Sequence, residues 1–160
     1  MSDSARGEYP DAPRVGVGAV VVRDGRVLLV KRGKPPSQGM WAIPGGRVEL
    51  GETLQQAVER EIREETSVTV RAGSPIHTFD VVLRDDDGRV RFHYVIVDML
   101  AEYVGGEPQA GDDAYEAGWK TAREIDALPV YPVTVDLLKR VTGLWNGGQS
   151  AGCGISEVNQ

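Results

Sequence analysis

The segment from Thr53 to Thr66 predicts an amphipathic helix, and this helix constrains the fold more than any other part of the sequence. Thr53 is suited to cap its N-terminus, because a threonine hydroxyl accepts a hydrogen bond from a free backbone N–H of the first turn. Apolar residues recur with helical spacing, and the predicted buried stripe is Leu54, Ala57, Val58 and Ile62. A helix with one apolar face must cover another element, so we expect it to pack on a sheet.

Segments rich in β-branched residues predict strands on both sides of this helix. The predicted strands are 15–23, 27–31, 41–43, 68–70, 76–83, 90–103 and 118–120. Asp24-Gly25 is a turn signal between the first two, and Pro44-Gly45-Gly46 is expected to end the third. Further helical segments are predicted at 121–128 and 133–141. Because strands and helices do not alternate strictly, the order favours a mixed sheet with helices on its faces over a doubly wound parallel sheet.

Composition limits the classes of protein that this chain can belong to. We expect one folded domain at 14–145 of the 160 residues, with a flexible polar arm at 1–13 and a flexible Gly- and Ser-rich tail at 146–160. The net charge of −6 disfavours a general nucleic-acid-binding surface. The longest apolar run, 15–22, is far shorter than the roughly 20 residues that span a bilayer. A single cysteine suits a reducing compartment, so we expect a cytoplasmic protein without membrane or nucleic-acid partners.

Three glutamates on the predicted helix need a physical explanation. Glu61, Glu64 and Glu65 stand at i, i+3 and i+4, so their like charges lie on one side and repel. They also lie in the C-terminal half, where the helix dipole disfavours anions. One interpretation is an ordinary solvated acidic face, which Arg60 and Arg63 partly neutralise. The other is a site for Mg²⁺ or Mn²⁺, since hard cations prefer carboxylate oxygens.

The spacing around these glutamates resembles a known family. The order is Gly46, five residues, Glu52, seven residues, Arg60-Glu61, an aliphatic residue, any residue, then Glu64-Glu65. This is the box of the Nudix hydrolases, here in a MutT-like form, and its six identities match by chance with a frequency on the order of 10⁻⁷ per position. One position departs from the family pattern. Ser67 stands where the family has Gly, in the turn after the helix, where we expect a positive φ.

The resemblance implies a fold, a reaction and a set of site residues. The fold it implies is an α/β/α sandwich with a mixed β-sheet, and the reaction is hydrolysis of a nucleoside diphosphate linked to another moiety. By position, Glu61, Glu64 and Glu65 would hold Mg²⁺, or alternatively Mn²⁺, with the backbone carbonyl of Gly45. Glu64 and Glu65 are the safer pair. Glu52 would act through water or by fixing the loop, and Gly46 and Arg60 would have structural roles.

Residues outside the box are weaker candidates, and each has a plain alternative. Lys31 and Arg32 end a predicted strand and either contact phosphate or are solvated edge charges. Asp113 and Glu116, in the acidic stretch before Trp119, are candidates for the catalytic base or belong to a polar loop. Trp41 could stack on a substrate ring or fill the core. We expect His77 and His93 to be sheet residues, and Cys153 in the tail not to be a nucleophile.

The substrate is less constrained than the reaction. Residues 92–101, Gly105-Gly106-Glu107-Pro108 and 112–119 are similar to the ADP-ribose pyrophosphatase subgroup, which implies ADP-ribose or a related nucleotide sugar. One alternative is a nucleoside triphosphate pyrophosphohydrolase, including one for oxidised nucleotides. Another is a non-catalytic nucleotide-sensing Nudix module, although the intact Glu61, Glu64 and Glu65 set argues against it. A homodimer is compatible with the sequence.

Overall fold

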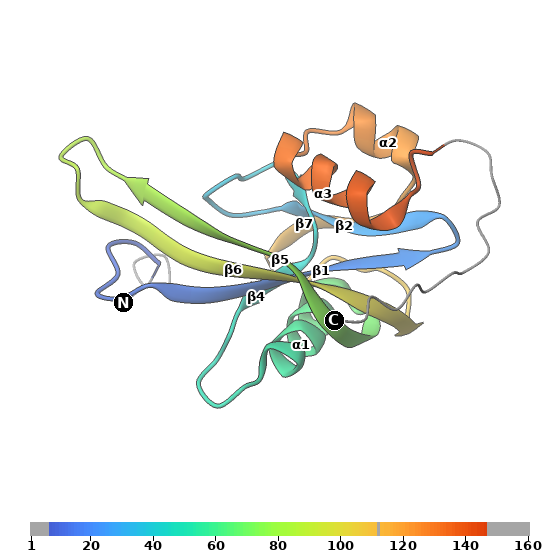
Figure 1. Cartoon of the computed structure of the whole chain (residues 1–160), viewed down its shortest axis with the longest axis horizontal. Helices are drawn as coiled ribbons and strands as arrows, with labels where there is room; N and C mark the ends of the chain where they lie inside the picture. The colour runs from blue at the N-terminus through green and yellow to red at the C-terminus, as the bar shows by residue number, and fades with distance from the viewer. Residues whose placement is uncertain (1–6, 112, 147–160) are drawn as a thin grey trace, which may run out of the picture.

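A computed structural model describes residues 7–111 and 113–146 (Figure 1). Within them the strands are β1 (Arg14–Arg23), β2 (Arg26–Arg32), β3 (Trp41–Ala42), β4 (Gly45–Arg47), β5 (Thr69–Arg84), β6 (Val90–Gly105) and β7 (Ala114–Lys120). The helices are α1 (Leu54–Thr66), α2 (Ala122–Ala127) and α3 (Pro132–Thr142). The outer parts of the predicted arm and tail, including Cys153, lie outside the described residues. None of the described helices is long and apolar enough to cross a membrane.

The sheet is mixed, as the order of elements predicts. Its strand order is β3-β2-β1-β6-β5, with β4 paired to β1 and β7 paired to β2. β1 and β6 are parallel, from Arg14 opposite Tyr94 to Val21 opposite Ala101, and the other strand pairs are antiparallel. The first half of β1 also pairs with β4, whereas its end pairs with β2. One edge of β1 therefore pairs with β6, and the other edge pairs with β4 along its first half and with β2 at its end.

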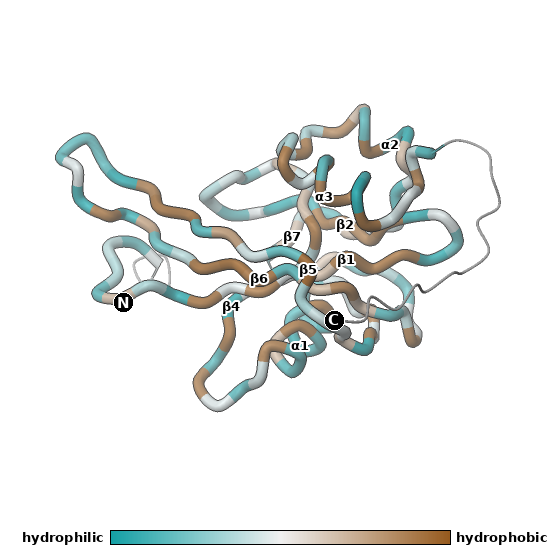
Figure 2. The backbone as a smooth tube through the Cα atoms, viewed as in Figure 1, coloured by the Kyte–Doolittle hydropathy of each residue, from teal (hydrophilic) through white to brown (hydrophobic). Residues whose placement is uncertain are grey.

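Helix α1 covers one face of this sheet, and α2 and α3 cover the other (Figure 1). The α1 side is packed around Val17, Val21, Val58, Ile62 and Met99. The other side includes Val20, Leu29, Trp41, Ile125 and Leu138. Figure 2 shows the hydrophobic stretches of the chain running along the strands between these helices. The expectation of an α/β/α sandwich is confirmed.

Helix α1 forms as its sequence predicts. Thr53 accepts a hydrogen bond from the Gln56 N–H, and the Gln56 side chain accepts one from the Thr53 N–H, which completes a capping box. Ala57, Val58 and Ile62 are fully buried, and Leu54 packs partly buried against the same core. Burying each large side chain contributes roughly 1.5–3 kcal/mol. The helix ends at Ser67, whose φ of 63° is the positive value expected for the family glycine.

Three strands differ from the predicted ones. The third predicted strand ends before Pro44 as expected, but Gly45 and Gly46 then begin the unpredicted strand β4, since they pair with Gly18 and Val17 of β1. A Cβ at Gly45 would lie 2.0 Å from the Val17 carbonyl oxygen, so this approach requires glycine. The two strands predicted at 68–70 and 76–83 are one strand, β5, with irregular pairing between Ala72 and His77. β7 begins at Ala114 rather than at 118, because residues 114–117 pair with the end of β2.

Candidate active site

The box residues come together where the last turns of α1 lie against β4. Gly46 lies directly over Glu61, so that a Cβ on Gly46 would be 2.3 Å from the Glu61 carboxyl carbon. The Gly45 N–H donates to Glu65 Oε2 at 3.0 Å. On the other side of the helix end, the Gly111 N–H donates to the Glu65 backbone carbonyl at 2.8 Å. The chain is therefore folded tightly around Glu61 and Glu65.

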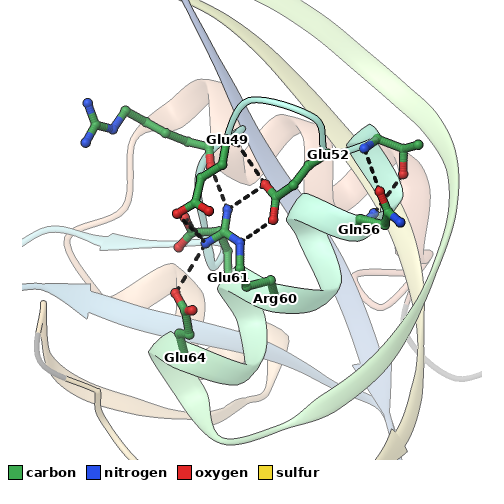
Figure 3. A network of polar contacts seen from close by, with 8 residues as sticks. Glu49, Glu52, Gln56, Arg60, Glu61 and Glu64 are labelled. Atoms are coloured by element: carbon green, nitrogen blue, oxygen red, sulfur yellow. Dashed lines mark hydrogen bonds and ion pairs between the residues drawn. The ribbon is translucent and has the colours of Figure 1, made fainter.

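Arg60 is the centre of a largely part-buried ion-pair network beside this helix (Figure 3). Its guanidinium donates to both carboxylate oxygens of Glu52 and, through Nη1, to Glu61 at 2.8 Å and Glu64 at 3.2 Å. It also donates to the Arg47 carbonyl oxygen at 2.9 Å. Hydrogen bonds from Arg60 and from the Glu49 N–H lower the pKa of Glu52 to about 2. Glu52 therefore ties the loop before α1 to Arg60, one of the two roles expected for it.

Glu65 has a different environment. It is half-buried, and burial is the main cause that raises its pKa to about 7. The Gly45 N–H and the charge of Arg32 oppose this rise, and the charges of Glu61 and Asp113 add to it. The charged form of Glu65 is thus disfavoured by its surroundings. A cation beside it would reverse that balance.

The three box carboxylates do not converge in this structure. Arg60 draws Glu61 and Glu64 toward its guanidinium, and the Glu64 side chain is 62% exposed, whereas Glu65 turns to Gly45. Within the described ranges, no three acidic, histidine or cysteine side chains lie close enough together to hold a metal ion. The chemistry of the donor set nevertheless fits a hard divalent cation, because carboxylates and a backbone carbonyl are its preferred ligands. The half-buried Glu65, held near its neutral form, is the observation that supports this fit.

The end of β2 and the start of β7 bring further predicted residues to the site. Arg32 and Asp113 lie near enough to Glu65 to change its pKa, in opposite directions. The Gly33 N–H donates to the Asp113 carbonyl at 3.0 Å, and the Lys34 ammonium pairs with the Asp113 carboxylate. Glu116 is different, because it lies in β7 opposite Lys31 and accepts a hydrogen bond from the Lys31 ammonium at 3.5 Å. The structure therefore gathers Arg32 and Asp113 at Glu65, whereas Lys31 and Glu116 pair with each other.

The aromatic and histidine candidates belong to the body of the sheet. Trp41 is 4% exposed in the core beneath α2 and α3, with the Lys120 ammonium 4.6 Å from its ring centroid. This burial favours a core role for Trp41 over stacking on a substrate. His77 lies in β5 and stacks on Phe79, with ring centroids 5.2 Å apart. His93 lies in β6 opposite Val82.

Sequence reasoning missed two residues. Gly111 lies so close to α1 that a Cβ would be 2.2 Å from the Glu64 carbonyl oxygen, and a glycine directly before an acidic pair was the available signal. Asp98 in β6 is 5% exposed, and burial raises its pKa to about 6. The signal there was a lone acid in the apolar run 94–101. Gly111 positions the segment that carries Asp113, whereas Asp98 belongs to the opposite face of the sheet from α1.

Comparisons with known proteins agree with this geometry. The NUDIX domain family matches residues 12–141. An "ADP-ribose pyrophosphatase" of Methanocaldococcus jannaschii is 40% identical over 105 residues, which are 66% of this chain and 60% of that protein, so the chain spans three-fifths of that relative's length. A "CTP pyrophosphohydrolase" of Escherichia coli is 30% identical over 131 residues, covering 80% of this chain and 90% of that one. The crystal structure of a MutT NUDIX hydrolase from Burkholderia pseudomallei is similar at a TM-score of 0.69, with 36% identity, and the match covers 82% of this chain and all of that one.

Proposed function

The chain belongs to the Nudix family and is a pyrophosphohydrolase, and on this premise we propose that it cleaves a nucleoside diphosphate linked to a second moiety, with ADP-ribose as the first substrate. The observation that carries the proposed chemistry is the half-buried Glu65 beside Gly45, a carboxyl group whose pKa burial raises to about 7 in spite of the nearby charge of Arg32. ADP-ribose is chosen because the relative at 40% identity is named for that substrate. The similarity of residues after 90 to that subgroup supports the same choice.

Nudix hydrolases generally use divalent metal ions. We propose Mg²⁺ here, with Mn²⁺ as the alternative, and Glu61, Glu64, Glu65 and the Gly45 carbonyl as the groups that would hold it. When bound, the ion would neutralise diphosphate charge and acidify a water molecule. The Arg32 guanidinium, beside Glu65, would bind a phosphate oxygen, and Lys31 is the second candidate for that contact.

Hydrolysis also requires a side chain that accepts a proton from the attacking water. A water oxygen bonds to one phosphorus, the bridging P–O bond breaks, and the proton of the water passes to a carboxylate. Asp113 is the better candidate for that carboxylate, because it lies close enough to Glu65 to influence its pKa. Glu116 is the second candidate, and each of the two carboxylates pairs with a lysine, Glu116 with Lys31 and Asp113 with Lys34. Glu52 has a supporting part, since it holds Arg60 and thereby Glu61 and Glu64 in place.

The second candidate function is hydrolysis of nucleoside triphosphates, including oxidised ones. The similarity to a protein named CTP pyrophosphohydrolase, which this chain covers over 90% of its length, favours it. A non-catalytic nucleotide sensor is a weaker alternative, because all three box glutamates are present. We also place the activity in the cytoplasm, since a single cysteine suits a reducing compartment.

The test is a comparison of kcat/KM for ADP-ribose, CTP and oxidised dGTP at one Mg²⁺ concentration, with products identified. We expect ADP-ribose to be preferred and to give AMP and ribose 5-phosphate. A preference of tenfold or more for a triphosphate, about 1.4 kcal/mol in transition-state binding, would select the second function. Binding of nucleotides without any hydrolysis would select the sensor. The Glu65→Gln variant, purified in parallel, shows whether a measured rate belongs to this site.

A further inference from the structure

The projecting β5–β6 hairpin has one covered edge and one bare edge. β6 pairs on its inner side with β1, and beyond the start of β1 the Tyr9 N–H donates to the Arg91 carbonyl at 2.8 Å. The outer side of β5, by contrast, pairs with no strand in the described part of the chain. Figure 1 shows that the end of this hairpin extends beyond the helices. An edge strand with free N–H and C=O groups is a template for another strand.

The two halves of β5 differ in how they are protected. Pairing is irregular between Ala72 and His77, and Pro75 lacks an N–H, so the first half is a poor template. From His77 to Leu83 the pairing with β6 is regular. Val82 and Leu83 in that half are 43% and 42% exposed. Figure 2 shows a hydrophobic stretch on this outer strand near the tip of the hairpin.

The charges on this half are arranged symmetrically about Val82. Asp80 lies two residues before it and Arg84 two residues after it, and both are exposed. We propose that a second copy of this chain pairs antiparallel with β5 about a twofold axis at Val82. Asp80 then lies opposite Arg84 of the second copy, and Val81 lies opposite its Leu83. Opposite charges and apolar residues facing each other stabilise an antiparallel pair.

Neighbouring registers lose this complementarity. An axis at Asp80 would place the two aspartates opposite each other, and an axis at Val81 would place Asp80 opposite Val82. An axis at Leu83 would place Val82 opposite Arg84 and Asp80 opposite Asp86. The two charges therefore select one register of self-pairing, whereas edge charges that guard against association disfavour every register. Arg84 is free to take part, because it uses a single N–H, donated to the Gly88 carbonyl at 2.9 Å within its own turn.

The proposed interface is independent of the proposed function. The carboxylate site lies at β4, which is on the opposite side of β1 from β6 and β5. Loss of the interface is therefore expected to leave hydrolysis unchanged. The two proposals can fail separately, one in a measurement of mass and the other in a measurement of rate.

Charge reversal tests the register. In sedimentation velocity over a concentration series, the wild type is expected to reach twice the 17.3-kDa chain mass. Asp80→Arg or Arg84→Asp places like charges opposite each other at two symmetric positions and should weaken the dimer about tenfold. The double variant D80R/R84D restores opposite charges and should return to the wild-type midpoint. Asp136→Arg, an equally drastic change at an exposed residue of α3, is the matched control and should have no effect.

Cross-linking tests the position of the axis. In a Cys153→Ser background, Val82→Cys should form a disulfide-linked dimer on oxidation, because Val82 faces its own copy. Val133→Cys, which replaces a 57% exposed valine of α3, should not. Circular dichroism checks that each variant is folded. A wild type that stays monomeric at every concentration overturns the proposal, and so does a dimer that tolerates D80R or whose position 82 does not cross-link.

Discussion

Within the Nudix box, the carboxylates around Arg60 and the carboxyl group of Glu65 have opposite electrostatic environments. Around Arg60, the carboxylates of Glu49, Glu52, Glu61 and Glu64 share one guanidinium, and the pKa of Glu52 falls to about 2. Around Glu65, burial prevails over one N–H donor and a nearby arginine, and the pKa rises to about 7. One region carries its own cation as a permanent part of the fold. The other has an anion for which the fold supplies no sufficient partner.

This difference separates stability from chemistry within one helix. Arg60 is expected to hold the loop and the helix together whether or not a metal ion is bound. Glu65 is expected to destabilise the metal-free protein and to become favourable only when a cation arrives. The following variants test that division, beginning with the one that should change the protein most.

The largest effect is expected from Glu65→Gln. The neutral amide is a poorer ligand for a cation, so kcat/KM should fall by about 100-fold or more, which is about 2.7 kcal/mol. Burying an amide costs less than burying a carboxylate, so the melting temperature without metal should hold or rise. Glu59→Gln on the same helix keeps an oxygen that can accept from the Ala72 N–H and serves as the control. An unchanged rate at saturating metal would contradict the role of Glu65.

Arg60→Met should give the opposite result, a loss of stability. Removal of the shared guanidinium leaves four carboxylates to repel one another, and we expect the free energy of unfolding to fall by about 2 kcal/mol. Urea denaturation in the presence of a chelator measures this change. Arg63→Met, one helical turn away, should change stability much less. If Arg60→Met were as stable as the wild type, the network would be incidental to the fold.

Asp98 extends the comparison, because it is a second carboxyl group whose pKa is raised by burial, against the opposing charge of His77 on the neighbouring strand, and it lies away from the box. Its folded pKa of about 6 exceeds the ordinary value of 3.8, so the folded state binds the proton more tightly than the unfolded state. Asp98 should therefore reduce stability as the pH rises from about 4 to 6. We expect Asp98→Asn to be more stable by about 1–2 kcal/mol at pH 8 and equal to the wild type below pH 4. Urea titrations at both pH values measure this, and an equal difference at both would contradict it.

The smallest effect is a change in stability expected at Ser67, the residue that ends α1 after Arg60 and Glu65. Its φ of 63° is costly for serine but not for glycine, so Ser67→Gly should raise the free energy of unfolding by about 0.5–1 kcal/mol. Because Ser67 supplies none of the proposed metal ligands, kcat should not change. Thermal unfolding and a rate assay on one preparation test both statements. A change in kcat would show that the turn controls the position of Glu65.

The sequence predicted those parts of the fold that depend on local patterns. The helix at 54–66, its threonine cap and its buried stripe followed from spacing alone, and the positive φ at Ser67 followed from the box. The predicted end of the third strand before Pro44 was confirmed, but β4 was missed, because the pairing of Gly45 and Gly46 with β1 is a contact between distant segments that local propensity does not reveal. The extension of β7 to Ala114 likewise depends on its partner, the end of β2.

The site could be predicted less completely than the helix that carries it. The i, i+3, i+4 spacing placed Glu61, Glu64 and Glu65 on one side, but it could not show that Arg60 would bind the first two while Glu65 turns to Gly45. Nor could it distinguish Asp113 from Glu116, since that choice depends on which of the two carboxylates lies near Glu65 in the folded chain. The positions of the box carboxylates and the choice between Asp113 and Glu116 both depend on contacts between segments distant in sequence. A single sequence does not reveal those contacts.

The parallel pairing of β1 with β6 also has a consequence for how the chain folds. Arg14 and Tyr94 are neighbours in that ladder although 80 positions separate them in the sequence, whereas β5 and β6 form a hairpin closed by a short turn. Contacts so distant in sequence cost more chain entropy to form, and they slow folding. We expect the hairpin and α1 to form first and β1 to be inserted between β6 and β2 late. Substitutions in the core of β1, such as Val17→Ala, should then mainly speed unfolding, whereas those in the hairpin should slow folding.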